Sequence, residues 1–578
     1  MKNNVRYSLN LILGISFLFS IANAYAQIST TELDRIFASD AAQGDGYGYA
    51  VDVDGDRAVI GSRLDDDGGN GSGAAYVYLK NSLTSLWQEE KKLVMASAAA
   101  GDNFGSSVAI DRNVIVVGAP QDDINVGSNL HGSAHVFTRG PNGWDDGVEL
   151  LPQDTDTSYQ NYGVSVDIDN DTIVVGVAYD NDEGTASGSA YVFELVSGTW
   201  QKTAKLLPPN AGTNQNFGWS VAIDNDTIVI GAPHWTASGA GSAYVFTRAG
   251  GWTDSSTTLP ATDVLADDQF GWSVAISSDI AVVGARMDDD VDNGTDSGSI
   301  SIFDRSSGSW DFKAKKTASN GAQSDWFGSD VATNGQAVVA GAQQSGNGAR
   351  GSIYSFSHTG SEWVEDGELW PPTNPGNVSF IQQFGASLAL DGTTLFVGAP
   401  ASDIYNGSSF VYITGAAFVY GLNATAIPAF NGGGLLTIQS PPGTFLTNVT
   451  AIDPATLGTL PQGISSPLGV SFPQEVSFPL GALGFNVNGL TPGAAIEVEI
   501  EFPEEVSASS YYKFSDQWYE FLDDGTTGAT VTPGKVTLKF VDGGRGDHDE
   551  TADGVIVDPG ALSVITIGET VFEDGFED

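Results

Sequence analysis

Five closely spaced carboxylates near the C-terminal end are the side chains in this sequence best suited to bind a metal ion. They are Asp542, Asp547, Asp549, Asp553 and Asp558. Glycines are interleaved with them, so the backbone between them can turn sharply. Calcium requires clustered oxygen ligands of this kind, although the spacing departs from an EF-hand because no terminal Glu stands at the right distance. The sequence therefore predicts calcium as the candidate cofactor, with an ordinary acidic turn as the alternative.

Two further sets of carboxylates occur earlier in the chain. Asp52, Asp54 and Asp56 alternate along a predicted strand, which places them on one face beside a short turn rather than around a cation. Acidic runs also follow several predicted strands, at residues 65–67, 122–123, 180–182 and 288–292. These loops offer oxygen ligands for calcium, but a solvated acidic surface is the interpretation that we favour.

No constellation of side chains stands out as catalytic. The five histidines are scattered, at His131, His135, His234, His358 and His548. The segment Gly218-Trp219-Ser220 resembles a nucleophile elbow, but it lacks the final glycine and precedes a predicted strand instead of a helix. We therefore expect that the protein is not an enzyme. The alternative is a polysaccharide hydrolase or lyase, in which folding brings two carboxylates to within about 5–10 Å in a central pocket.

The composition excludes several classes of partner. The 578 residues include 72 acidic and 23 basic side chains, giving a formal net charge of −49, with 72 glycines and no cysteine. Such a charge argues against nucleic acid or anionic lipid as the main partner, because both require a basic face. The absence of cysteine leaves stability to packing, hydrogen bonding and metal ions.

The first 26 residues have the pattern of a bacterial secretory signal. Lys2 and Arg6 precede the apolar run 11–19, and Ala24-Tyr25-Ala26 provides a cleavage site of the expected type. A membrane anchor is the alternative. No later segment approaches the ~18 apolar residues that a spanning helix needs. We therefore expect the mature chain to be secreted or displayed at the cell surface without a membrane span.

One sequence motif is repeated along two-thirds of the chain, and each copy starts with an aromatic residue followed by glycine. Its seven copies have their glycines at Gly48, Gly105, Gly163, Gly218, Gly271, Gly328 and Gly385. The spacings of 53 to 58 residues are too long for helical solenoid repeats and close to those of propeller blades. Each copy contains β-branched runs separated by short Asn/Asp turns, which predict about four strands. The fold class predicted is therefore all-β, with a seven-bladed β-propeller over residues 33–422.

The last copy lacks its fourth strand, whereas an unmatched strand-like segment stands before the first copy. Residues 33–40 match the end of the fourth strand seen around Lys205-Leu206. We therefore expect the mature N-terminus to close the ring by pairing with the strand that contains Phe418-Val419-Tyr420. The glycines of the aromatic-Gly pairs should allow close contact between blades, and the aromatic rings should fill the space between the sheets.

These residues resemble the FG-GAP repeat of integrin alpha-chain propellers and their bacterial relatives. Complete Gly-Ala-Pro segments begin at Gly118, Gly231 and Gly398. Degenerate versions begin at Gly61, Gly176, Gly284 and Gly341. The resemblance implies an extracellular propeller that serves in adhesion or ligand recognition. The calcium loop that integrin repeats often carry between their first two strands is absent here, so those metal sites are not transferred.

Residues 424–568 form a second predicted module, and residues 569–578 an acidic tail. The runs 495–501 and 536–540 have the composition and alternation of strands, and we expect a β-sandwich-like domain. Segments such as Leu490-Thr491-Pro492-Gly493 resemble the bacterial choice-of-anchor U domain, which occurs near the C-terminus of exported proteins. The tail lacks the apolar helix and basic end of a membrane-processed sorting signal.

Together these features predict an exported bacterial binding or adhesion protein. Its propeller would be a platform for an extracellular protein or glycan ligand, and the sequence leaves its oligomeric state open. The polysaccharide hydrolase or lyase described above remains the alternative.

Overall fold

The computed structural model describes residues 32–421 apart from short loop stretches, and beyond residue 421 it describes the strands alone. The stretches left out are 82–85, 124–131, 152–159, 211, 235–238, 249–250, 253–255, 261–262, 306–307, 359–361, 373–377, 406–409 and 412–413. The predicted signal segment 1–26 and tail 569–578 lie outside the described residues. In the described part of the chain, no helix combines the length and the hydropathy needed to cross a membrane.

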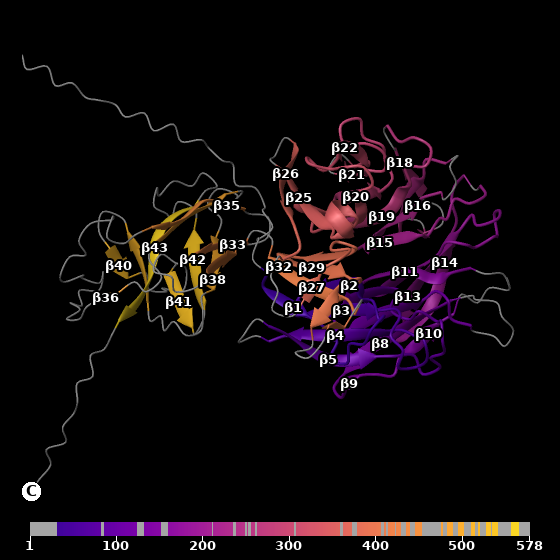
Figure 1. The fold of residues 1–578 in the computed structure, drawn as a ribbon, viewed down its shortest axis with the longest axis horizontal. Coiled ribbons are helices and arrows are strands. Elements are labelled where there is room, and N and C mark those ends of the chain that lie inside the picture. The colour runs from indigo at the N-terminus through magenta and orange to yellow at the C-terminus, as the bar shows by residue number, and fades with distance from the viewer. Residues whose placement is uncertain are drawn as a thin grey trace, which may run out of the picture.

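The fold is all-β, and seven antiparallel sheets form a seven-bladed propeller, as the repeats predicted (Figure 1). Blade 1 contains β2 (Tyr47–Asp54), β3 (Arg57–Ser62), β4 (Ala74–Lys80) and β5 (Trp87–Leu93). Blade 2 contains β6 (Ser107–Asp111), β7 (Val114–Ala119), β8 (Ser133–Gly140) and β10 (Val148–Leu150), with β9 (Gly143–Trp144) paired to β8. Blade 3 contains β11 (Tyr162–Asp169), β12 (Thr172–Val177), β13 (Ser189–Val196) and β14 (Thr199–Leu206).

The remaining blades repeat this order from the centre of the propeller to its rim. Blade 4 contains β15 (Ser220–Asp224), β16 (Thr227–Ala232), β17 (Ser242–Thr247) and β18 (Ser256–Leu259). Blade 5 contains β19 (Phe270–Ser277), β20 (Ile280–Ala285), β21 (Ser299–Asp304) and β22 (Asp311–Lys316). Blade 6 contains β23 (Phe327–Thr333), β24 (Ala337–Ala342), β25 (Ser352–His358) and β26 (Trp363–Leu369). In Figure 1 the first strands β2, β11, β15 and β19 lie towards the centre, and β5, β14 and β22 lie at the rim.

The seventh blade is built from both ends of the propeller sequence, which confirms the predicted closure. It contains β28 (Ser387–Asp391), β29 (Thr394–Ala399), β32 (Ala416–Gly421) and, as its outer strand, β1 (Asp34–Ile36). β1 runs antiparallel to β32, with Arg35 opposite Phe418. The carboxylate of Asp34 also accepts a hydrogen bond of 2.7 Å from the backbone N–H of Trp87 in blade 1. The N-terminal segment therefore ties the last blade to the first.

The hydrophobic core of the propeller lies between the blades. In the described residues it consists of seven clusters, each shared by two neighbouring blades. The aromatic ring of every aromatic-Gly pair has no exposed surface, as predicted, at Tyr47, Phe104, Tyr162, Phe217, Phe270, Phe327 and Phe384. The following glycine has a positive φ, and a Cβ on Gly105 would lie 2.2 Å from the carbonyl oxygen of Ala74. Only glycine allows this approach between blades.

Several smaller elements lie outside the regular blades. β27 (Val378–Phe380), β30 (Asp403–Tyr405) and β31 (Phe410–Val411) form a three-stranded sheet, and a π-helix (Ser345–Ala349) precedes β25.

The strands beyond residue 421 form two antiparallel sheets, and the two runs predicted as strands are among them. One sheet has the order β33 (Ala424–Pro428), β34 (Leu435–Gln439), β38 (Ala495–Glu501), β42 (Lys535–Val541), β41 (Gly528–Thr532). The other has the order β35 (Phe445–Ile452), β37 (Ala482–Asn488), β43 (Ile556–Ile565), β39 (Ser510–Phe514), β40 (Trp518–Glu520), with β36 (Val476–Ser477) beside β43.

Candidate functional site: the wide mouth of the central channel

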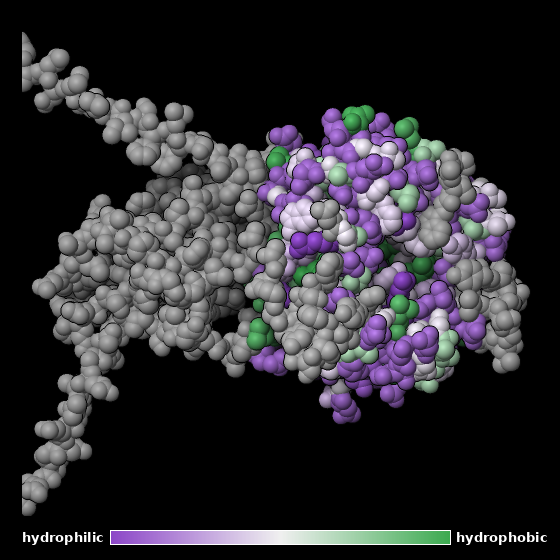
Figure 2. All heavy atoms as spheres, viewed as in Figure 1, coloured by the Kyte–Doolittle hydropathy of each residue, from purple (hydrophilic) through white to green (hydrophobic). Residues whose placement is uncertain are grey.

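The first strands of the blades surround a central channel that opens at two mouths. The starts of these strands line a cavity of about 610 Å³, which we call the wide mouth. Their ends line a second cavity of about 360 Å³, the narrow mouth. The visible face of the described residues is predominantly hydrophilic (Figure 2). Both volumes lie in the range of 300–1,000 Å³ that is common for small-molecule sites, and the wide mouth, which is the larger of the two, is the candidate site.

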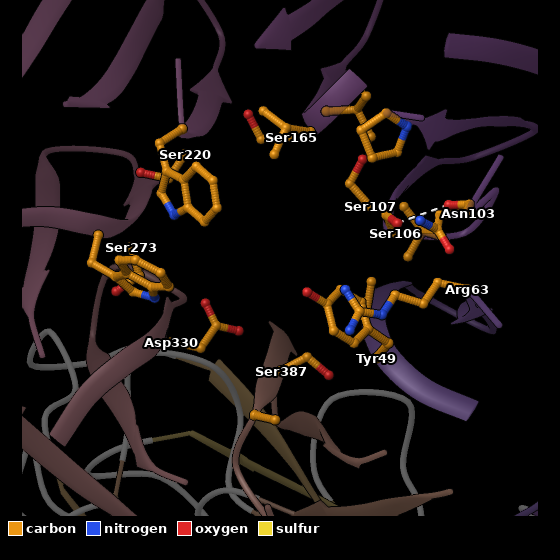
Figure 3. A pocket seen from close by; sticks show the side chains of 18 of the residues that line it. Tyr49, Arg63, Asn103, Ser106, Ser107, Ser165, Ser220, Ser273, Asp330 and Ser387 are labelled. Carbon is orange, nitrogen blue, oxygen red and sulfur yellow. Dashed lines mark hydrogen bonds between the residues drawn. The ribbon is translucent and has the colours of Figure 1, made fainter. Parts of the chain in front are cut away.

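Serine hydroxyls form a ring around the wide mouth (Figure 3). They occupy the third position after the aromatic residue of the repeat, at Ser107, Ser165, Ser220, Ser273 and Ser387. Each hydroxyl donates to the carbonyl oxygen of the repeat glycine in the next blade at 2.9–3.0 Å, as Ser387 does to Gly48. Because a hydroxyl carries one proton and two lone pairs, these serines still have acceptor capacity for a ligand.

Aromatic rings and one guanidinium group, that of Arg63, line the same cavity, and a second guanidinium, that of Arg286, stacks on one of the rings. The rings of Trp219 and Trp272 have centroids 4.9 Å apart, and both side chains are half-buried. The guanidinium of Arg286 lies 3.1 Å from the ring centroid of Trp272, and that of Arg63 lies 3.8 Å from the ring of Tyr49. Such stacking holds the planar guanidinium by its face and leaves N–H groups at its edge available.

Neither arginine has an anionic partner within ion-pair distance among the described residues. Nε of Arg286 donates to the side-chain oxygen of Gln269 at 2.9 Å. The two terminal nitrogens of the guanidinium take no part in this bond. Burial lowers the pKa of Arg286 to about 10, with Tyr49 and Asp296 acting in the opposite direction. The group therefore remains a cation at neutral pH, and it is only half-exposed to the water that would stabilise its charge.

Asp330 is the one acidic side chain among the described residues that line the wide mouth. It takes the place of the ring serine in blade 6, and its Oδ2 accepts a hydrogen bond of 2.7 Å from the backbone N–H of Leu388 in blade 7. Burial raises its pKa to about 7, against the effect of the backbone hydrogen bonds. The two nearby carboxylates of a hydrolase are therefore not both present in the described lining.

The narrow mouth is lined by carboxylates whose oxygens already bind the backbone of the neighbouring blade. Asp52 accepts from the N–H of Ile110 at 2.7 Å, and Asp167 accepts from the N–H of Ile223 at 2.6 Å. Burial raises the pKa of Asp167 to about 7 and that of Asp52 well above its ordinary value. Asp52 and Asp54 both lie on β2 and line this mouth, at the end of the strand where the sequence placed them. They join adjacent first strands around the ring.

In three of the four acidic loops after the second strands, the first aspartate is paired with a lysine. Asp65, Asp180 and Asp288 are buried, and each forms an ion pair of 2.7–2.8 Å with a lysine of the fourth strand of its own blade. These lysines are Lys92, Lys205 and Lys315. The preferred prediction, a solvated acidic surface, was therefore wrong for the first aspartate of these loops.

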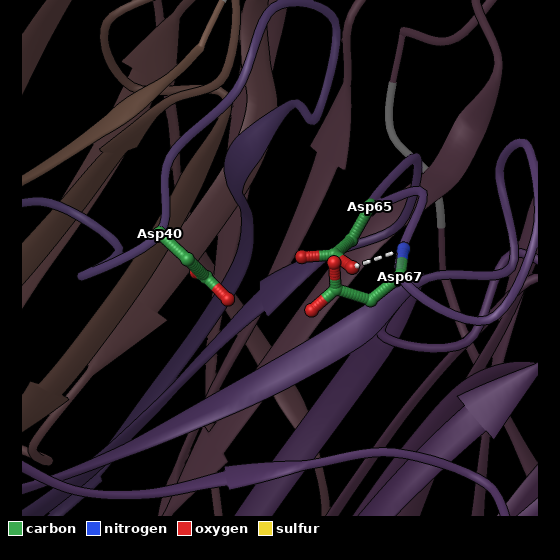
Figure 4. A group of neighbouring side chains, drawn as sticks. All are labelled: Asp40, Asp65 and Asp67. Carbon is green, nitrogen blue, oxygen red and sulfur yellow. Dashed lines mark hydrogen bonds between the residues drawn. The ribbon is translucent and has the colours of Figure 1, made fainter.

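One of these loops brings three carboxylates together, as a metal site would. Oxygens of Asp40, Asp65 and Asp67 lie within 4.8 Å of one another (Figure 4). Nζ of Lys92 lies 2.7–2.8 Å from all three side chains. The ammonium group thus holds the position that a calcium ion would take.

Blade 2 places Asp122, Ser133 and His135 in contact, but not in the order that nucleophilic catalysis requires. The hydroxyl of Ser133 donates to Asp122 at 2.6 Å and lies 2.9 Å from Nε2 of His135. In a catalytic triad the carboxylate contacts the histidine instead. Ser133 has no exposed surface, and burial lowers the pKa of His135 to about 4. This group is a buried polar network, which replaces the Asp–Lys pair of other blades.

The carboxylates proposed from the sequence as calcium ligands are mostly outside the described residues. Asp542, Asp547, Asp549 and Asp553 fall in the stretch 542–555, which the structure does not describe. Asp558 lies in β43, where its backbone is opposite Phe485 of β37.

No residue of the wide mouth was predicted from the sequence as a binding residue, although the sequence contains a signal for them. Arg63 and Arg286 occupy the place of proline in two of the degenerate Gly-Ala-Pro segments. Tyr49, Trp219 and Trp272 directly follow the repeat glycine. Alignment of the seven copies would have shown that bulky aromatic and basic residues replace small ones at these two positions.

A family model described as FG-GAP repeat matches six stretches of the chain, at residues 30–78, 87–137, 144–193, 200–246, 252–303 and 310–356. No match was found among curated proteins. Each matched stretch begins near the fourth strand of one blade and ends in the third strand of the next, so the sequence repeat is shifted by one strand from the blade. These stretches cover slightly more than half of the chain and carry six of the seven aromatic-Gly pairs and four of the five ring serines. The chain therefore belongs to the FG-GAP repeat family.

Proposed function

We propose that this protein is an exported bacterial binding and adhesion protein, whose propeller recognises an extracellular or cell-surface ligand at the wide mouth. The observation that carries the proposal is a cavity of about 610 Å³ lined by a ring of serines, by aromatic rings and by Arg63, with Arg286 stacked on one of the rings and neither arginine in an ion pair among the described residues. Exposed aromatic and arginine side chains with few competing partners are typical of recognition sites.

Binding without catalysis is the proposed activity. Asp330 would need a second carboxylate partner for glycoside hydrolysis, and its oxygen is engaged by the N–H of Leu388. Incubation of the protein with polysaccharides should therefore release no reducing or unsaturated ends. Release that disappears in Asp330→Asn would instead establish the hydrolase or lyase alternative.

Export through residues 1–26, and display at the cell surface or secretion, are part of the same proposal. The C-terminal strands are proposed to belong to a choice-of-anchor U-like module that holds the propeller away from its attachment point. We also propose that the module binds calcium. The carboxylates that would coordinate the ion are those of Asp542, Asp547, Asp549, Asp553 and Asp558. The support for these statements is the sequence pattern.

The test is a binding screen of the purified mature protein against glycan arrays and cell-surface extracts. The double variant Trp219→Ala, Trp272→Ala should lose binding, because it removes the stacked rings of the wide mouth. Trp370→Ala is the matched control, since Trp370 is 39% exposed and lies outside the described lining. Equal binding by all three proteins would exclude the wide mouth as the recognition site.

A further inference from the structure

We propose that the wide mouth binds a saccharide that carries a carboxylate or a sulfate group. The inference rests on the proposed function, since it names the ligand class of the same site. Three features of the mouth each require one property of the ligand: an apolar ring face, hydroxyl groups and a negative charge.

The aromatic residues require a ligand with a flat apolar face. Trp219 and Trp272 lie together at the mouth, with ring planes tilted by 46° and centroids 4.9 Å apart, and the guanidinium of Arg286 covers part of the Trp272 ring. A pyranose ring has C–H groups on its faces and hydroxyls at its edge, and it can therefore pack flat against an indole. The cavity has the volume of sites that enclose small ligands, and a globular protein surface would not enter it.

The serine ring requires a ligand rich in hydroxyl donors. Each of the five ring serines has committed its proton to a glycine carbonyl of the next blade, as Ser165 does to Gly218. What remains on each Oγ is acceptor capacity, and it is partly exposed at Ser107, Ser165 and Ser220. Sugar hydroxyls can donate to these atoms, whereas an acidic peptide segment has few such donors in its side chains. The ring thus favours a saccharide over an acidic peptide.

The two arginines require an anion. Arg63 lines the cavity, and Arg286 stacks on Trp272 and also lies 4.8 Å from the ring centroid of Trp326. A guanidinium held by its face offers paired N–H donors in its plane, which match the two oxygens of a carboxylate or of a sulfate. Because neither group has an ion-pair partner among the described residues, the ligand would supply the missing negative charge.

The overall charge of the protein limits the length of such a ligand. A formal net charge of −49 opposes the approach of a long polyanion. We therefore infer that the mouth takes a short segment or chain end, not the middle of an extended polymer. Long-range repulsion of this kind is screened by salt, so binding should survive physiological ionic strength.

The experiment measures calorimetric binding of the mature full-length chain to defined probes. The probes are tetragalacturonate, its carboxyl-reduced neutral counterpart, a sulfated galactose tetrasaccharide and a tetraglutamate peptide. The variants are Arg63→Gln and Arg286→Gln, with Arg112→Gln as the matched control. Arg112 lies near the narrow mouth, is exposed and is paired with Asp111, so the control makes the same change in charge away from the site.

The proposal expects binding of at least one anionic saccharide, with the affinity falling about tenfold to a hundredfold in each of Arg63→Gln and Arg286→Gln, as for loss of a charged hydrogen bond. The carboxyl-reduced probe should bind correspondingly more weakly, and Arg112→Gln should match the parent chain. Preference for the uronate or for the sulfated probe identifies which anion is recognised.

Three results would overturn this inference. Equal affinity for the acidic and the reduced saccharide, with loss only in Trp219→Ala, Trp272→Ala, would leave the binding function standing and remove the anionic ligand class. Binding of tetraglutamate in preference to every saccharide would assign the mouth to acidic peptides. Absence of binding to all four probes would reject the anionic saccharide, and the cell-surface screen described above would then decide separately whether the wide mouth binds any ligand.

Discussion

Buried carboxylates in this propeller are stabilised by three kinds of partner, and the choice differs between blades. Asp180 forms an ion pair with Lys205 and accepts a hydrogen bond from the hydroxyl of Ser189, whereas Asp122 accepts one from the hydroxyl of Ser133. Asp167 uses backbone N–H groups alone. Blade 6 has Ser345 in place of the loop aspartate and Glu368 in place of the lysine, so both charges change together. Blade 2 keeps the loop aspartate, Asp122, while Glu149 stands at the lysine position, and the Ser133 hydroxyl is its partner there.

At the residue scale, the Asp–Lys pair of blade 3 can be tested by removing one charge and then both. Lys205→Met should cost about 2–4 kcal/mol of unfolding free energy, because Asp180 has no exposed surface and loses its counter-charge. The double variant Asp180→Ser, Lys205→Met should recover most of that loss. Chemical denaturation measures both changes, and Lys313→Met is the control because its pair with Asp311 is long and exposed. A double variant no more stable than the single would contradict this account.

The inner carboxylates give the propeller a predictable dependence on pH. Burial raises the pKa of Asp167 to about 7, so the folded state holds a proton that the unfolded state, with an ordinary pKa near 3.9, releases. Stability from this group is therefore fully present below about pH 4 and is lost as the pH rises through 7.

Asp167→Asn should accordingly be more stable than the parent at pH 8 by at least about 1 kcal/mol, and nearly equal to it at pH 4. The amide oxygen still accepts from the N–H of Ile223, so the bond to blade 4 is kept. Thermal unfolding at the two pH values is the measurement, with the exposed Asp145→Asn as control. The same difference at both pH values would show that Asp167 is not protonated on folding.

At the scale of the elements, contacts between strands of neighbouring blades depend on glycine in both partners. Gly61 of β3 has an ordinary φ, yet a Cβ there would lie 2.1 Å from the carbonyl oxygen of Gly105 in the next blade. Gly61→Ala should therefore force the two blades apart and cost about 3 kcal/mol or more. Gly367→Ala in β26 is the matched control, because a Cβ there meets nothing within 4 Å.

Gly367→Ala should be neutral or stabilising by up to about 1 kcal/mol, through a less flexible unfolded chain. Differential scanning calorimetry compares the two variants directly. Similar melting temperatures would mean that the spacing between blades adjusts more easily than the contact at Gly61 suggests.

The elements were largely predictable from the sequence, whereas the site was not. The recurrence of residues such as Phe217-Gly218 specified the blade count, and the missing fourth strand specified the pairing of residues 33–40 with the last blade. In contrast, the Asp180–Lys205 pair joins a loop to a strand on the far side of β13, and no spacing in the sequence reports that distance. The stacking of Arg286 on Trp272 likewise depends on how the first and second strands of a blade end at the channel.

At the scale of the whole molecule, the ring is closed by one short strand. β1 contains three residues, but it covers the edge of β32, and Asp34 also bonds to blade 1. Deletion of residues 27–39 should lower the melting temperature of the whole propeller and expose blade 7 to limited proteolysis. Deletion of the tail 569–578 is the control and should change neither property. An unchanged unfolding transition after removal of β1 would show that the other six blade contacts are sufficient.

The propeller and the C-terminal module should differ in how much their stability depends on calcium. In the propeller, ammonium groups such as that of Lys92 already lie among the loop carboxylates, so the cation would have to displace a buried ion pair. The segment from Asp542 to Asp558 contains one arginine, Arg545, and five aspartates, of which Asp558 lies in β43; crowding such carboxylates without a cation would be unfavourable. We therefore expect calcium to stabilise the C-terminal module more than the propeller.

The measurement is calorimetric unfolding of the mature chain with calcium and with chelator. Ligand at a hundredfold excess over its Kd adds about 2.7 kcal/mol to a folded unit that alone binds it, so the transition of the C-terminal module should shift while that of the propeller stays. Asp547→Ala, Asp549→Ala should abolish the shift, and Asp574→Ala, Glu577→Ala in the tail provides the same change in charge as a control. Identical curves in calcium and chelator would identify the loop as a solvated turn. A shift confined to the propeller would instead mean that its lysine-filled loops exchange their ammonium groups for the metal.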